Sequence, residues 1–89
     1  MNDEFMPVNE DEQMIYKTKT GESVIAKVGY YVYGKTNFYD EPKKFVIKRF
    51  IHVFDPKTFQ PITLMIANDK KMGEFVFPEE EIMNITTVE

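Results

Sequence analysis

The chain has no cysteine among its 89 residues, so neither a disulfide nor a thiolate-bound metal can support its fold. It also has no run that approaches the ~20 apolar residues of a membrane-spanning helix. The N-terminal residues 1–6 lack the basic start and the apolar stretch of a secretion signal. These absences predict a cytoplasmic protein that makes no use of a membrane.

An excess of basic residues is missing as well. The formal net charge is −4, and residues 1–12 carry five negative charges, which leaves one net positive charge on the rest. The strong basic footprint of a typical nucleic-acid binder is therefore absent. The composition predicts a flexible acidic arm over residues 1–13 and one small domain over residues 14–89.

The sequence motifs of common enzymes are missing too. No Gly-rich phosphate loop, nucleophile elbow or zinc-ligand spacing occurs. His52 is the only histidine and has no nucleophile beside it, which favours a packed or edge histidine over a catalytic base. Glu79–Glu81 could hold a cation, but acidic residues beside a one-turn helix are the preferred interpretation. The sequence predicts no enzyme activity, no catalytic residue, no metal, no cofactor and no small-molecule substrate.

What the chain does have is a succession of β-strand patterns. Runs rich in β-branched and aromatic residues lie at 14–19, 23–33, 45–54, 62–67, 75–77 and 82–86. Gly29 inside the second run predicts a bulge or a sharp bend, which a strand needs if it serves both sides of a small barrel. Only Pro78 and Glu79–Glu81 separate the last two runs, so one tight turn is expected there. No segment has a sustained helical period, and the predicted fold is all-β and antiparallel.

The order of these runs resembles the Sm and Sm-like family. Residues 16–28 and 45–48 resemble its first motif, with Gly21 in the turn and Ala26 where a glycine is usual. Residues 75–85 resemble its second motif, an apolar strand, a short break and a closing strand. The Lys-Thr-Gly-Glu turn and the Phe-Pro break are similar to short Sm-like proteins of tailed bacteriophages. The resemblance implies a strongly bent, five-stranded, SH3-like barrel. If a phage encodes the chain, the predicted location is the cytoplasm of its bacterial host.

The first function that the resemblance implies is a non-enzymatic scaffold. Copies of the chain would form a homo-oligomeric ring of five to seven subunits. The fourth strand of one copy, residues 62–67 with a continuation through 75–77, would pair with the closing strand 82–86 of the next. The predicted interface residues are Ile62, Leu64, Ile66, Phe75, Phe77, Ile82 and Ile85.

The second implied function is an RNA-binding ring. The family's uridine site uses an aspartate, which could be Asp40, an asparagine, where Lys44 stands, and an Arg-Gly pair, where Pro78-Glu79 stands. The usual uridine-binding residues are therefore not retained. A substitute surface would consist of Phe38, Tyr39, Asp40, Lys43 and Lys44, although aromatic rings folded back onto the domain are preferred. A monomeric SH3-like or OB-like protein-interaction domain is the third hypothesis.

Overall fold

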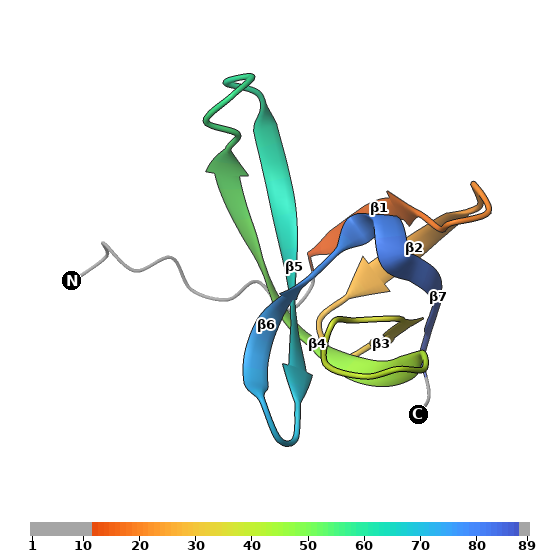
Figure 1. The fold of residues 1–89 in the computed structure, drawn as a ribbon. Coiled ribbons are helices and arrows are strands. Elements are labelled where there is room, and N and C mark those ends of the chain that lie inside the picture. The colour runs from red at the N-terminus through yellow and green to blue at the C-terminus, as the bar shows by residue number, and fades with distance from the viewer. Residues whose placement is uncertain (1–11, 88–89) are drawn as a thin grey trace.

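The computed structural model describes residues 12–87, and the regular elements in that part of the chain are seven β-strands and one short 3-10 helix. The elements are β1 (Gln13–Lys17), β2 (Ser23–Lys27), β3 (Tyr31–Gly34), β4 (Lys43–Phe54), β5 (Pro61–Asp69), β6 (Gly73–Phe77), η1 (Glu79–Glu81) and β7 (Ile82–Thr86). Five strands form one antiparallel sheet in the order β6-β5-β4-β3-β7, and β1 and β2 form a separate hairpin (Figure 1). The predictions of an all-β fold and a five-stranded antiparallel sheet are confirmed. Most of the predicted acidic arm lies outside the described residues.

The run predicted over residues 23–33 is two strands joined by a sharp bend. Gly29 lies at the bend with φ of +95°, a conformation that glycine adopts without steric cost. Its amide donates to the carbonyl of Ile47 at 2.9 Å, which ties the bend to β4. The predicted bend is confirmed, and it sends β2 to the hairpin and β3 into the sheet.

The five-stranded sheet is strongly curled. Its two end strands, β6 and β7, are joined only by Pro78 and η1. A flat sheet would hold them ~19 Å apart, whereas a 3-10 helix rises only ~2 Å per residue. The backbone of β3 at Gly34 lies very close to η1 and to the end of β6. A Cβ atom at Gly34 would lie 2.7 Å from Phe77 Cζ and 2.2 Å from the Glu81 carbonyl oxygen. The short connection therefore brings the two end strands toward each other and curves the sheet.

The core lies inside this curl and beneath the β1–β2 hairpin. Its buried hydrophobic residues are Tyr16, Ala26, Val32, Phe45, Ile47, Met65, Ala67, Phe77 and Ile82. Tyr16 of β1 packs the β1–β2 hairpin against the sheet, since its ring stacks on Phe50 of β4 with 6.5 Å between the ring centroids. Phe45 packs edge-on against Phe75 at 5.2 Å on the other side of the core. Aromatic packing thus joins both parts of the domain.

The distal halves of β4 and β5 leave the body as a two-stranded projection. β3 pairs only with residues 43–46 of β4, and β6 pairs only with residues 65–69 of β5. Residues 49–64 therefore form a projecting hairpin, which stands away from the rest of the chain in Figure 1. At its tip Phe59 is 78% exposed and has φ of +59°. Its amide donates to the Asp55 carbonyl at 2.7 Å and closes the turn, while a left-handed conformation is unusual for an aromatic residue.

The predicted continuation of residues 62–67 into residues 75–77 is wrong. The chain reverses after Asp69, and Gly73 has φ of +80° at the end of the turn. The Asp69 carboxylate accepts the Met72 amide at 3.1 Å and fixes that turn. β5 and β6 are consequently antiparallel neighbours rather than one strand.

Several residues predicted at a subunit interface serve the core of the single chain instead. Ile66, Phe77 and Ile82 are at most 5% exposed, so their side chains cannot reach a second copy. Phe75 and Ile85 are half-buried and pack against the core. Ile62 is 38% exposed and remains available, with Leu64 half-buried beside it. The two-residue period alone does not identify the concave face of a curled sheet, so it did not distinguish these buried side chains from exposed ones.

Candidate functional site

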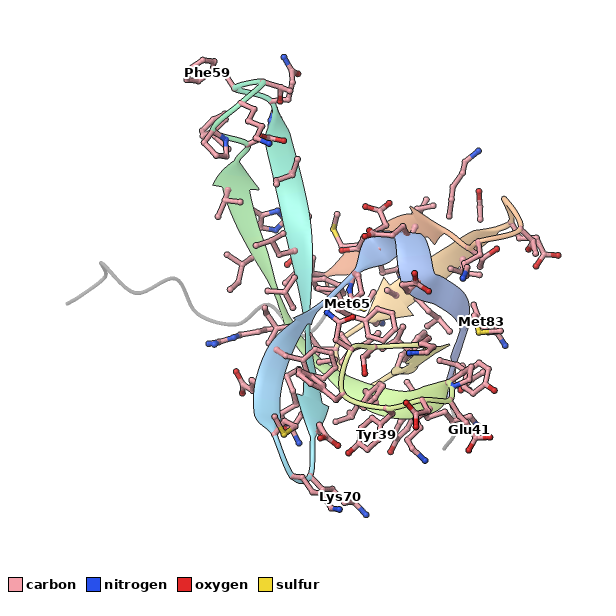
Figure 2. The ribbon with its side chains drawn as sticks, viewed as in Figure 1. Tyr39, Glu41, Phe59, Met65, Lys70 and Met83 are labelled. Carbon is pink, nitrogen blue, oxygen red and sulfur yellow. The ribbon has the colours of Figure 1, made fainter. Side chains whose placement is uncertain are left out.

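An open groove of about 610 Å³ lies where the start of β4 meets the β5–β6 turn. Its lining residues are Tyr31, Tyr39, Lys43, Lys44, Phe45, Val46, Asn68, Asp69, Lys70 and Lys71. Four lysines and one carboxylate give this lysine groove a net positive charge. Figure 2 shows Tyr39 and Lys70 together at this end of the molecule, opposite Phe59 at the tip of the projecting hairpin.

Tyr39 is anchored at the groove by its hydroxyl group. The hydroxyl donates to the Asp69 carboxylate, with both oxygens at 2.9 Å. This hydrogen bond to Asp69 raises the pKa of Tyr39, because ionisation of the phenol would place two negative charges in contact. The Tyr39 ring is held as well, with Lys43 Nζ 5.2 Å from its centroid and Phe45 tilted against it at 6.2 Å. Tyr39 is a fixed wall of the groove.

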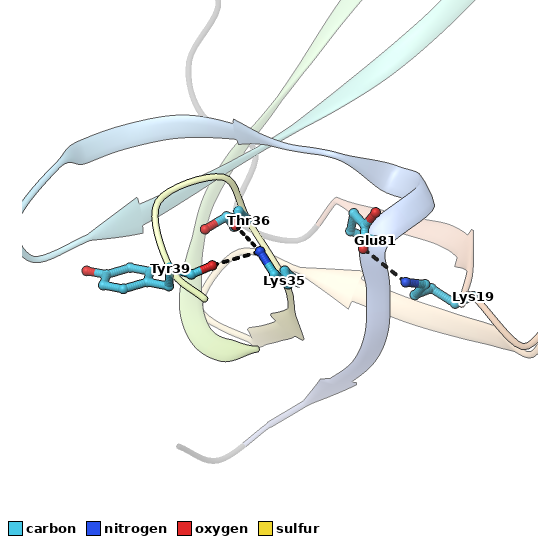
Figure 3. A network of polar contacts seen from close by, with 5 residues as sticks. All are labelled: Lys19, Lys35, Thr36, Tyr39 and Glu81. Atoms are coloured by element: carbon cyan, nitrogen blue, oxygen red, sulfur yellow. Dashed lines mark hydrogen bonds and ion pairs between the residues drawn. The ribbon is translucent and has the colours of Figure 1, made fainter. Parts of the chain in front are cut away.

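The loop that carries Tyr39 is closed by Lys35 rather than left open. Lys35 Nζ donates to the carbonyls of Tyr39 at 2.8 Å and of Thr36 at 3.2 Å (Figure 3). The Lys35 ammonium group therefore forms its hydrogen bonds within the loop. Phe38 packs edge-on against Phe75 at 5.1 Å and is 41% exposed. The preferred prediction, in which the two aromatic rings fold back onto the domain, agrees with these contacts.

The structure brings together only part of the predicted RNA surface. Tyr39, Lys43 and Lys44 line the groove, while Phe38 and the exposed Asp40 do not. Lys70 and Lys71, which lie in the turn between β5 and β6, complete the groove. The signal that could have grouped them is the pairing of β4 with β5, since Val46 lies opposite Asn68. That register carries residues 43–44 toward residues 70–71.

The lysine groove can bind an extended anion. Lysine ammonium groups contact phosphates as point charges, and the exposed lysines line one opening together with Tyr31 and Tyr39. Proteins that bind single-stranded nucleic acids combine aromatic and basic side chains in one groove in this way. The three residues of η1, Glu79–Glu81, are by contrast all acidic and offer no positive charge to an anion.

His52 lies on the projecting hairpin, opposite Thr63 in the register of β4 and β5. Its Nδ1 atom is 2.9 Å from Thr63 Oγ1, and its Nε2 atom contacts the Glu12 carboxylate. The order hydroxyl, imidazole, carboxylate is that of a catalytic relay, but the His52 side chain is 57% exposed to water. The three groups connect the hairpin to the segment before β1, in agreement with the predicted edge histidine. Within residues 12–87, no three histidine or acidic side chains gather where they could hold a metal ion.

A second candidate site is formed by the end strands β6 and β7. Each has one strand neighbour, β5 and β3 respectively, among residues 12–87. Both also present apolar side chains to solvent, with Val76 48% and Met83 42% exposed. A strand at the end of a sheet offers backbone donors and acceptors to another strand.

Comparison with protein-family models, with curated proteins and with solved structures finds no match to this chain. Among the described residues 12–87, no helix has the length and apolar character needed to cross a membrane.

Proposed function

We propose that this protein is a non-enzymatic, Sm-like scaffold whose copies close a ring of five to seven subunits. The observation that supports the proposal is the sheet order, because β6 and β7 stand at opposite ends of one curled antiparallel sheet. The curl, the bend at Gly29 and the one-turn η1 connection also fit a small barrel of the Sm type.

The ring follows from pairing β6 of one copy with β7 of the next. These two edges differ, so each contact is heterologous and leaves one edge of each kind at the ends of the assembly. Only closure into a ring leaves no β6 or β7 edge unpaired, and closure removes the aggregation hazard of these two strand edges. The exposed Val76 on β6 and Met83 on β7 supply apolar surface at this contact.

Sedimentation of the purified protein tests this proposal. We expect one species with five to seven times the mass of the monomer at micromolar concentration. Val76→Lys adds a charge on β6 and should shift the population toward monomer, since lysine is a natural blocker of strand edges. Met72→Lys is the matched control, because Met72 is 58% exposed in the neighbouring turn. A wild-type protein that sediments as a monomer would overturn the ring.

A second candidate function is binding of single-stranded RNA in the lysine groove. It is supported by the four lysines and the tyrosines that surround one opening of about 610 Å³. Fluorescence anisotropy with labelled oligouridine and oligoadenine tests it, and binding tighter than the nonspecific range of ~10⁻⁴–10⁻⁶ M is expected. Substitution of the groove lysines by glutamine should weaken binding and flatten its salt dependence by ~0.7 in logarithmic slope per lost phosphate contact.

The matched control for the RNA experiment replaces lysines outside the groove. Lys48 and Lys57 are exposed and absent from the groove lining. Lys48→Gln combined with Lys57→Gln lowers the net charge by the same two units as Lys43→Gln combined with Lys44→Gln, and the control pair should leave affinity and salt slope close to those of the wild type. Equal effects from both sets of variants would mean that only diffuse electrostatic contact occurs.

A further inference from the structure

One face of the projecting hairpin is entirely aliphatic over two successive cross-strand pairs. Ile51 lies opposite Leu64, and Val53 lies opposite Ile62. Directly opposed residues and residues two apart share a face of a β-ribbon, so these four side chains form one surface, the aliphatic face. Val53 is 37% and Ile62 38% exposed. An isolated two-stranded ribbon is marginally stable in water, so a surface of this kind calls for a cover.

A second exposed aliphatic surface lies on the β1–β2 hairpin. Ile15 and Ile25 are directly opposed in its register. They are 70% and 51% exposed, whereas Tyr16 and Ala26 on the opposite face are buried in the core. The isoleucine pair has the same construction as the aliphatic face, a flat patch on a two-stranded ribbon. Packing of the two patches would bury β-branched side chains against each other.

The two surfaces adjoin the two strands that pair in the proposed ring. Two residues beyond Leu64, β5 places the buried Ile66 opposite Val76, which is 48% exposed on the β6 strand. The β1–β2 hairpin meets the start of β7, because the Lys19 amide donates to the Ile82 carbonyl at 2.8 Å and Lys19 Nζ lies 3.1 Å from Glu81 Oε1 (Figure 3). A contact between β6 of one copy and β7 of the next therefore brings these two surfaces to the same junction.

Strand pairing alone does not bury the surface area that a stable interface needs. A specific interface takes ~800 Å² from each partner, which is about an eighth of the 6441 Å² surface of this chain. The β6 strand has five residues and is ~17 Å long. An edge of that length cannot contribute the whole area, so an additional contact beside it is needed.

We propose that the aliphatic face of each projecting hairpin covers the Ile15–Ile25 pair of the next copy in the ring. This inference rests on the proposed ring and names its second contact. The occupant of the aliphatic face is thus a second copy of this chain, and the hairpin laps over its neighbour instead of pointing into solvent. The interface is heterologous, as closure of a ring requires.

Single charges in the two surfaces test the contact. Ile15→Lys and Val53→Glu each bury an unpaired charge at every interface, so each should weaken assembly at least ~10-fold in sedimentation or light scattering. The double variant Ile15→Lys with Val53→Glu places opposite charges across every interface and should recover at least part of the lost assembly. Met72→Lys again serves as the control and should stay within about twofold of the wild type. Circular dichroism verifies that each variant is folded.

The possible outcomes separate this inference from the ring itself. A monomeric wild-type protein would remove both. A wild-type ring that Val76→Lys dissociates, but that Ile15→Lys and Val53→Glu leave intact, would keep the ring and overturn the hairpin contact. Loss of assembly with Val53→Glu alone, without an effect of Ile15→Lys, would mean that the aliphatic face packs on a different surface and would also overturn the inference.

Discussion

The replacement of Gly34 by alanine tests the curl of the sheet. Gly34 is buried on β3, beneath the connection between β6 and β7. A Cβ atom there would lie 2.2 Å from the Glu81 carbonyl oxygen and 2.7 Å from Phe77 Cζ. Both distances are far below a normal carbon contact of ~3.5–4.0 Å. The closer atom belongs to the backbone, so no rotation of a side chain can make room.

Gly34→Ala should therefore destabilise the fold by ~1–3 kcal/mol, the usual cost of overpacking a well-filled site. Without a clash, alanine in a strand would stabilise the fold by ~0.5–1 kcal/mol relative to glycine. A net loss of stability would therefore be evidence for the clash. In a domain of this size, ~2 kcal/mol corresponds to a decrease in Tm of ~8–16 °C. Relief of the clash must push η1 outward, and with it the start of β7, so the proposed ring should also weaken.

Urea unfolding followed by circular dichroism at a fixed protein concentration measures this loss. Gly21→Asn is a suitable control, because Gly21 has φ of +89° with nothing within 4 Å of a built Cβ, and asparagine tolerates that conformation. We expect the control to change the free energy of unfolding by less than ~1 kcal/mol. If Gly34→Ala is as stable as the wild type, the close approach of β3 to η1 is wrong.

Three further predictions follow from single side chains. Burial, followed by the charges of Glu79 and Glu12, raises the pKa of Tyr16 from 10.0 to about 12. The folded protein therefore favours the neutral phenol, and its contribution to the free energy of unfolding should be fully present below pH 10. This contribution should fall by up to ~1.4 kcal/mol per pH unit as the pH rises from 10 toward 12. Tyr16→Phe should remove this part of the pH dependence in urea titrations. Tyr39→Phe deletes the donor to the Asp69 carboxylate and should lower the urea midpoint, and an unchanged midpoint would contradict a structural role for that bond. Phe59→Asn relieves a left-handed conformation with φ of +59° and should raise stability by ~0.5–1 kcal/mol in thermal unfolding, whereas a loss would mean that the Phe59 ring has a partner.

Strand positions followed closely from local patterns in the sequence. The last run was predicted at 82–86 and is β7 with the same bounds, because Pro78 and three glutamates leave room for only one turn before it. The bend at Gly29 was predicted from a glycine inside a β-branched run, and its positive φ is the reason that glycine is required. Signals of this kind act over a few residues and need no knowledge of distant partners.

The pairing of distant strands could not be predicted in the same way. Residues 62–67 and 75–77 are separate runs in the sequence, and the predicted continuation of one into the other is wrong because the Lys70–Lys71 turn makes them antiparallel neighbours. The same pairing moves Lys70 and Lys71 to the groove beside Lys43 and Lys44. Each strand offers two faces and two edges, and only the fold as a whole selects among them.

The sequence by itself determined that this chain is a small, cysteine-free, all-β domain and where most of its strands lie, since β-branched runs and turn residues act locally. Only the tertiary structure decided which surfaces remain for function. Curling of the sheet buried Ile66, Phe77 and Ile82 and exposed the pairs Ile15–Ile25 and Val53–Ile62. Burial depends on contacts between residues far apart in the chain, and those contacts form only when the sheet closes over its core.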